Sequence, residues 1–190
     1  MIIGIGHKKN MGKDTFANML DQAFLKSFHM VSTVKSISDP LFNAGGLLFG
    51  WAGMKMARAY NEDYSLKEKE LPGLPGVTPR DIAKSIGNLC RSVHPDSLVK
   101  AVVGNASENE AVIITNIRFP NEAKAVKDAG GILIKVTRPS VKIDQDDPFD
   151  TALDDWKDWD YEVLNDGTLD DLIVQAHIVA GIAIKRKDSK

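Results

Sequence analysis

The sequence has only one cysteine, Cys90, among its 190 residues. A single cysteine excludes an internal disulfide and a zinc site built from cysteines, and it fits a reducing compartment. The apolar run at the N-terminus ends at His7, which is too short for a signal peptide. No other run approaches the roughly 20 apolar residues of a membrane span. We therefore expect a cytoplasmic protein without a membrane partner.

The sequence also lacks an excess of positive charge. It has 24 lysines and arginines against 26 aspartates and glutamates, which gives a net charge of −2. Proteins that coat nucleic-acid polymers need a dense surplus of cations, so any nucleotide bound here is expected to be small. With 43 % apolar residues and no internal repeat, the chain predicts one domain over residues 1–190.

The N-terminal fifteen residues have the layout of a phosphate-binding P-loop. An apolar strand over residues 2–6 leads into a short polar loop, and a helix with apolar residues at helical spacing follows over residues 13–28. Backbone N–H groups, the helix dipole and the Lys13 ammonium would all favour a polyphosphate. The candidate contacts of a nucleoside triphosphate are His7, Lys8, Lys9, Asn10, Met11, Gly12, Lys13, Asp14 and Thr15.

This loop departs from the G-x-x-x-x-G-K-[ST] pattern at two positions. His7 stands where the first glycine is expected, with Gly6 one place early, and Asp14 replaces the Ser or Thr that ligates Mg²⁺. Thr15 is the nearest hydroxyl that could take this role. The alternative is a glycine-containing strand-to-helix turn that binds nothing.

The rest of the chain predicts an α/β protein with a mostly parallel sheet between helices, the three-layer P-loop kinase arrangement. Further strands are expected near residues 30–34, 111–115, 132–136 and 161–164. Helices are expected over 79–93, 95–104 and up to Ala129, and a last one after the capping box Thr168 to Asp171. Between residues 35 and 79, prolines and glycines separate short helical pieces, which predicts an insertion that covers the substrate.

Residues 140–160 are rich in aspartate. The segment does not fit an EF-hand calcium loop. Phe149 stands where the loop requires glycine, and Asp155 stands where it requires glutamate. We expect a solvated face or a mobile lid.

Arginines at other strand ends are candidates for contacting the transferred phosphate. Arg118 and Arg138 follow predicted strands, and Arg80 and Arg91 frame the helix over 79–93. Phosphoryl transfer depends on positioning and cationic stabilisation, which arginine supplies. For each one, a surface ion pair is the alternative.

Several motifs together resemble the bacteriophage-type deoxynucleoside monophosphate kinases. Most of the chain is covered, and the motifs occur in the family's order: Gly12-Lys-Asp-Thr15, Asp39-Pro-Leu41, Thr78-Pro-Arg-Asp-Ile82 with Gly87 and Arg91, Asn116-Ile-Arg-Phe-Pro-Asn-Glu122, Gly130-Gly131 to Arg138-Pro139, and Asn165-Asp-Gly-Thr-Leu169. The resemblance implies an adenylate-kinase-like fold. It also implies transfer of the γ-phosphoryl group of ATP, with Mg²⁺, to a deoxynucleoside 5′-monophosphate.

The resemblance also implies roles for single residues. Lys13 would bridge the β- and γ-phosphates with help from Lys9, and Arg118 would stabilise the transferring group. Arg138 would contact ATP and Asp14 the metal. The acceptor would meet an insertion over residues 35–95 and a lid-like segment over 139–160, through Lys35, Arg80, Arg91, Asp147 and Asp150.

Three departures from the family leave alternatives open. Asn116 replaces an aspartate, Asp147-Pro-Phe-Asp150 replaces a His-x-Ser-Glu-like segment, and Phe42 replaces a lysine. The alternatives are a nucleotide-binding protein that has lost turnover, or a kinase of another phosphorylated acceptor such as phosphomevalonate. The preferred base stays open, with Phe42, Phe49, Trp51, Tyr60 and Tyr64 as stacking candidates, and so does the choice between monomer and homodimer.

Overall fold

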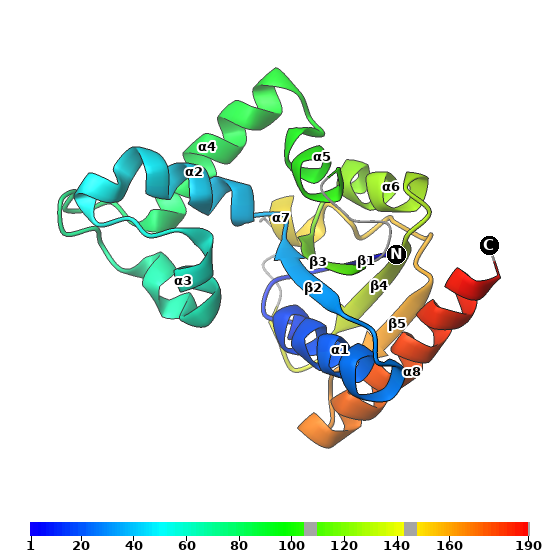
Figure 1. Ribbon diagram of the computed structural model, residues 1–190. Helices are drawn as coiled ribbons and strands as arrows, with labels where there is room; N and C mark the ends of the chain where they lie inside the picture. Colours follow the sequence, from blue (N-terminus) through cyan, green and yellow to red (C-terminus); the bar gives the residue numbers. More distant parts are fainter. Residues whose placement is uncertain (105–109, 143–147, 190) are drawn as a thin grey trace. The chain divides into compact units, whose positions relative to one another are not determined.

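The computed structural model describes residues 1–104, 110–142 and 148–189. It divides into two compact units (Figure 1). The first comprises Met1–Ser36 and Val103–Lys190, and the second comprises Ile37–Val102. The second unit overlaps the segment that the sequence predicts as an insertion.

A parallel five-stranded sheet forms the centre of the first unit. The strands are β1 (Ile2–Gly6), β2 (Ser32–Ser36), β3 (Ala111–Ile117), β4 (Ile132–Thr137) and β5 (Tyr161–Leu164), in the order β2-β3-β1-β4-β5. Each neighbouring pair is parallel. The interior strand β3 is almost wholly buried, as its unbroken apolar run predicts. The predicted α/β class with a parallel sheet between helices is confirmed.

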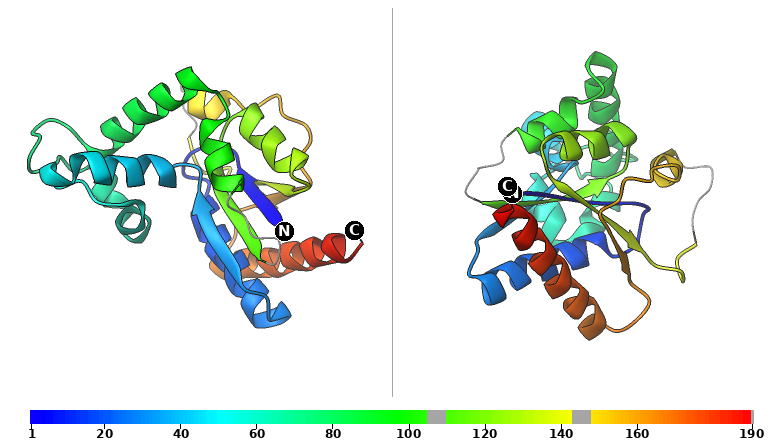
Figure 2. Two further views of the ribbon diagram at one scale, coloured as in Figure 1. Left: turned by 45° about the horizontal axis from the view of Figure 1, so that its top comes forward. Right: turned by 90° about the vertical axis from the view of Figure 1, so that its right-hand side faces the viewer.

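Helices cover both faces of this sheet. α1 (Lys13–Phe28) and α8 (Leu169–Asp188) pack against each other on one face, and α6 (Pro120–Asp128) lies on the other (Figures 1 and 2). Residues of β1 alternate between the two faces. Ile3 and Ile5 join the core beneath α1, whereas Gly4 leaves room for Val126 of α6.

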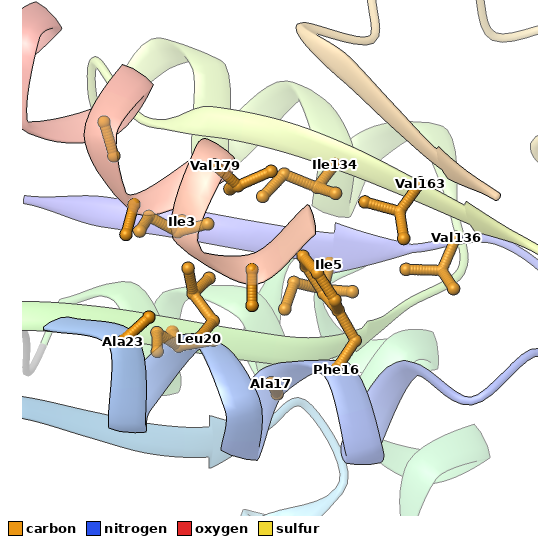
Figure 3. Close-up of a cluster of buried hydrophobic side chains, with 14 of the residues drawn as sticks. Ile3, Ile5, Phe16, Ala17, Leu20, Ala23, Ile134, Val136, Val163 and Val179 are labelled. Carbon is orange, nitrogen blue, oxygen red and sulfur yellow. The ribbon is translucent and has the colours of Figure 1, made fainter. Parts of the chain in front are cut away.

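The main core lies between the sheet, α1 and α8 (Figure 3). Phe16 and Leu20 of α1 are fully buried in one cluster with Ile3 and Ile5 of β1, and Val179 of α8 belongs to the same cluster. Burying residues of this size contributes about 1.5–3 kcal/mol each. This core holds β1 and α1 rigidly on either side of the loop that joins them.

Short helices build the second unit: α2 (Asp39–Phe49), η1 (Gly50–Ala52), α3 (Ala57–Glu62), η2 (Tyr64–Glu68), α4 (Pro79–Val93) and most of α5 (Ser97–Val103). The sequence predicts that Gly45 and Gly46 separate helical pieces, but both lie inside α2. The reason is close packing, because a Cβ at these positions would collide with the side chains of Met54 and Met56. These glycines therefore accommodate close contacts inside a helix rather than form turns.

Element boundaries agree closely with the sequence pattern. The capping boxes of Thr78 with Asp81 and of Thr168 with Asp171 are both present, which confirms the predicted starts of α4 and α8. β2 begins at Ser32, two residues later than expected, and β3 continues to Ile117. In the described part of the chain, none of the helices combines the length and apolar character that crossing a membrane requires.

Candidate active site

The candidate site lies at the carboxyl edge of the sheet, where four neighbouring strands end. β1 leads into the loop over residues 7–12, and Arg118, Arg138 and Asn165 follow β3, β4 and β5. Because these strands are parallel and adjacent, their ends meet at one edge, which is where α/β proteins bind ligands.

The backbone of the loop has an unusual conformation. His7, Asn10 and Gly12 all have positive φ values, of 92°, 61° and 87°. Gly12 is the N-cap of α1, and its carbonyl accepts the N–H of Phe16 at 2.9 Å. The first N–H groups of α1 therefore face the loop without intrahelical partners, an arrangement that favours anions.

Asn165 holds the loop in place from β5. Its Nδ2 donates to the Met11 carbonyl at 3.0 Å, and its own backbone N–H donates to Thr137 at 2.8 Å. A Cβ on Gly12 would collide with this amide nitrogen. The predicted site residues do not include Asn165, although it begins the late Asn-Asp-Gly-Thr-Leu motif.

Met11 and Arg138 form a second connection between the loop and the sheet. Met11 is buried, and its Sδ accepts the backbone N–H of Arg138 at 3.1 Å. The Arg138 residue itself is exposed. Its backbone thus supports the loop, while the predicted contact of its guanidinium with ATP stays a prediction.

Lys13 is a deeply buried cation of the site. Only 4 % of the residue is exposed, and its Nζ donates to the Lys8 carbonyl inside the loop. Burial, followed by the nearby Arg118 charge, lowers the Lys13 pKa to about 7. An anion placed beside this ammonium would favour its charged form.

Glu122 positions Arg118. Its buried carboxylate accepts the backbone N–H groups of Arg118 at 2.9 Å and of Phe119 at 3.2 Å, at the start of α6. Glu122 therefore caps the start of α6. The Arg-Phe-Pro-Asn-Glu segment therefore fixes the backbone from which the arginine extends.

Asp150 joins the loop to Arg118. It lies in α7 (Pro148–Thr151), and its residue is 7 % exposed. One oxygen, Oδ1, accepts both the backbone N–H of Lys9 at 2.8 Å and Arg118 Nη1 at 3.3 Å. A backbone N–H and a guanidinium thus converge on a single anionic oxygen close to Lys13.

The acidic segment supplies a second partner to the loop. Lys8 is buried, and its Nζ lies 2.6 Å from Asp154 Oδ1. His7 packs edge-on against Trp159 with ring centroids 6.4 Å apart. Burial lowers the His7 pKa to about 4, helped by the charges of Lys135 and Lys8, so the imidazole is neutral at pH 7.

These contacts correct one expectation. The sequence predicts a solvated face or a lid over residues 140–160, but the solvated-face interpretation is wrong for Asp150, which is buried against Arg118. Its cationic and N–H partners come from distant parts of the chain, so composition alone could not reveal them. Asp147 lies outside the described residues.

Asn116 has a backbone role that the sequence did not show. It sits in a bulge, where three residue steps of β3 match two steps of β1, and its φ is 63°. Asparagine adopts this left-handed conformation more easily than most residues. Its side-chain amide also donates to Ser36 Oγ at 3.0 Å.

Asp14 and Thr15 are exposed on the first turn of α1, where the predicted metal ligand would lie. Among the residues that the structure describes, three or more acidic, histidine or cysteine side chains nowhere gather into a metal-binding group. Mg²⁺ in kinases needs only one or two carboxylates together with phosphate oxygens. Asp14 therefore fits a metal held mainly by a nucleotide.

The remaining predicted residues belong to β2 and to the second unit. Lys35 is half-buried in β2 of the first unit. Arg80 and Arg91 belong to α4 of the second unit, where Arg80 pairs with Glu68 at 2.5 Å and with the Tyr64 hydroxyl at 2.9 Å.

Two of the five stacking candidates are core residues of the second unit. Phe42 and Tyr60 are 4 % and 2 % exposed and pack with ring centroids 4.9 Å apart. Trp51 is 72 % and Tyr64 46 % exposed, and Lys67 Nζ lies 4.5 Å from the centre of the Tyr64 ring. Exposed aromatic surface in this unit is thus concentrated at Trp51 and Tyr64 rather than at Phe42 and Tyr60.

No protein-family model matches the chain. A solved structure of a sugar kinase from Janibacter sp. HTCC2649, without ligand, aligns over 97 % of this chain and 96 % of its own, at 10 % identity and a TM-score of 0.43. A protein of Acanthamoeba polyphaga mimivirus with the name "Putative deoxynucleotide monophosphate kinase" is 27 % identical over 195 residues, which cover 92 % of this chain and 93 % of that protein. The resemblance drawn from the motifs is confirmed: the chain is similar over nearly its whole length to a kinase of the deoxynucleotide monophosphate type.

Proposed function

We propose that the protein transfers the γ-phosphoryl group of ATP to a deoxynucleoside 5′-monophosphate, giving the diphosphate and ADP. The observation that carries the proposal is the convergence of Lys9 N–H and Arg118 on one carboxylate oxygen of Asp150, beside the buried Lys13. Two donors that converge on one anionic oxygen, at 2.8 and 3.3 Å, could accept a phosphate oxygen in its place.

Each group has a defined part in this reaction. The Lys13 ammonium exchanges the Lys8 carbonyl for oxygens of the terminal phosphates, and the loop N–H groups bind the same phosphates. Arg118 neutralises charge on the transferring group, while Glu122 keeps its backbone in place. The acceptor oxygen is already a phosphate anion, so positioning and charge stabilisation supply most of the catalysis and no strong base is needed.

Mg²⁺ would be held by Asp14 together with nucleotide oxygens, and when bound it neutralises charge on the β- and γ-phosphates. The exposed position of Asp14 on the first turn of α1 supports this assignment. In the proposal, Lys35, Arg80 and Arg91 contact the acceptor, and the arginines favour its phosphate group.

One alternative has an observation in its favour. The donors that would bind phosphate already have partners within the chain. The Lys9 N–H and Arg118 donate to Asp150, and Lys13 donates to the Lys8 carbonyl. A protein in which these contacts persist would bind a nucleotide weakly and would not turn it over. Such a protein would regulate or bind partners rather than catalyse.

A coupled assay of ADP release tests the proposal. ATP, Mg²⁺ and each deoxynucleoside monophosphate are supplied in turn, with phosphomevalonate as a different acceptor. Lys13→Ala is the test variant and Lys26→Ala, an exposed lysine on the same helix, is the matched control.

Turnover that depends on a deoxynucleotide, falls about a hundredfold or more in Lys13→Ala and persists in Lys26→Ala supports the kinase. Nucleotide binding without turnover for any acceptor supports the alternative. Turnover with phosphomevalonate alone would overturn the assignment of a nucleotide acceptor.

A further inference from the structure

The outer face of α8 has a row of exposed apolar residues. Val174, Ile178 and Ile182 are 58 %, 47 % and 40 % exposed, and they follow one another at intervals of four residues. The opposite face of the helix is packed into the core through Leu172, Ala176, Val179, Ala180 and Ala183. Single exposed apolar residues are ordinary, but three branched side chains in one line are typical of a contact surface.

Charges of opposite sign continue this row at its two ends. Asp171 precedes Val174 by three residues, and Lys185 follows Ile182 by three. Both lie seven residues from Ile178, hence only about 20° from it around the helix axis. Both residues are exposed. Along the helix, this face therefore presents one acidic residue, three apolar residues and one basic residue, with Ile178 at its centre.

We propose that this face pairs with the same face of a second copy of the chain, with the two α8 helices antiparallel about a two-fold axis near Ile178. In this arrangement Val174 meets Ile182 of the second copy, and Asp171 meets Lys185. A two-fold interface requires a surface that complements itself, and charges placed symmetrically with opposite sign satisfy that condition. The antiparallel helix dipoles add to the attraction.

The spacing of the row suits helix pairing. Positions 171, 174, 178, 182 and 185 are separated by three, four, four and three residues, which is close to the alternating steps of three and four along a coiled-coil seam. Gly181 lies beside the row, and its missing side chain opens space next to the Phe28 ring of α1, which is 37 % exposed. Phe28 therefore widens the apolar surface on the side where α1 packs against α8 (Figure 2).

Analytical ultracentrifugation over a range of protein concentrations tests the pairing. The wild-type chain is expected to form dimers, and Ile178→Glu is expected to be monomeric at concentrations where the wild type is dimeric, because two like charges would meet at the axis. Val93→Glu is the matched control, since Val93 is 81 % exposed on α4, and it is expected to leave the dimer intact. Circular dichroism confirms that both variants are folded.

Cross-linking tests the direction and register. In a Cys90→Ser background, a short bismaleimide should join two copies of Ile178→Cys. It should also join Val174→Cys to Ile182→Cys in a mixture, but not Val174→Cys to itself, because those residues would be offset by about 12 Å. A wild-type chain that stays monomeric at every concentration, or efficient linking of Val174→Cys to itself, would overturn the proposal.

Discussion

Lys13 combines deep burial with a pKa of about 7, and this predicts that nucleotide binding takes up a proton. At pH 8 the free protein holds Lys13 mostly neutral, whereas phosphate oxygens favour the charged ammonium and raise its pKa. Binding at pH 8 should therefore absorb close to one proton, and affinity should fall as the pH rises above 7.

Calorimetry in buffers of different ionisation enthalpy measures this uptake. Lys13→Arg, whose guanidinium stays charged, should bind with little uptake and serves as the control. An apparent binding enthalpy of the wild type that is the same in all buffers would contradict the prediction.

Gly12 is constrained by both its φ of 87° and the Asn165 amide. An alanine in the left-handed backbone conformation costs roughly 1–2 kcal/mol. Gly12→Ala should lower the free energy of unfolding by more than this, because the new methyl group also collides with the Asn165 amide. In an Asn165→Ala background the collision disappears, so the same substitution should cost less.

Urea unfolding of the two single variants and the double variant gives the coupling between these residues. Additive effects would mean that the Asn165 amide moves aside without cost. The wild type and these three variants can also be assayed for ATP binding, which should be weakest in Gly12→Ala.

The segment from the end of β3 into α6 depends on Glu122. Its buried carboxylate accepts two backbone N–H groups, so Glu122→Gln should lower the free energy of unfolding by about 1–3 kcal/mol. Because Arg118 loses one of these contacts, turnover should also fall. Urea unfolding and ADP-release assays measure the two effects. Glu162→Gln, at an exposed position on β5, is the control and should change neither the free energy of unfolding nor the turnover.

The bulge at Asn116 makes a different prediction. Asn116→Gly should be nearly neutral in stability, because glycine adopts a φ of 63° freely, apart from the lost hydrogen bond to Ser36. Asn116→Val should cost at least about 1–2 kcal/mol more, because a β-branched residue is poorly accommodated there. Thermal unfolding of Asn116→Gly and Asn116→Val measures this difference in stability. Equal midpoints would show that the backbone of the bulge adjusts to valine without cost.

Phosphoryl transfer needs protection from water, and this leads to a prediction about the whole chain. We expect amide hydrogen exchange to slow in residues 37–79 and 148–160 when ATP and the acceptor are present together, and less with either alone. Lys13→Ala should show no such synergy. If exchange in both segments is the same with and without the two nucleotides, the predicted closure is wrong.

The sequence by itself determined the elements of this protein. The apolar run of β3, the helical spacing in α1 and the capping boxes of α4 and α8 are local signals that the structure reproduces. The loop from His7 to Gly12 was also found from local sequence, because its glycine and lysine precede a helix directly.

Only the tertiary structure decided the partners of the loop. Lys9 and Asp150 are 141 residues apart, and Met11 and Asn165 are 154 apart, so their contacts leave no periodic or local pattern to read. The same holds for Gly45 and Gly46, which are interpreted as turns until Met54 and Met56 are seen against them. Local spacing sets helices and strands through repeated short-range contacts, whereas the site depends on which strand ends the fold brings to one edge.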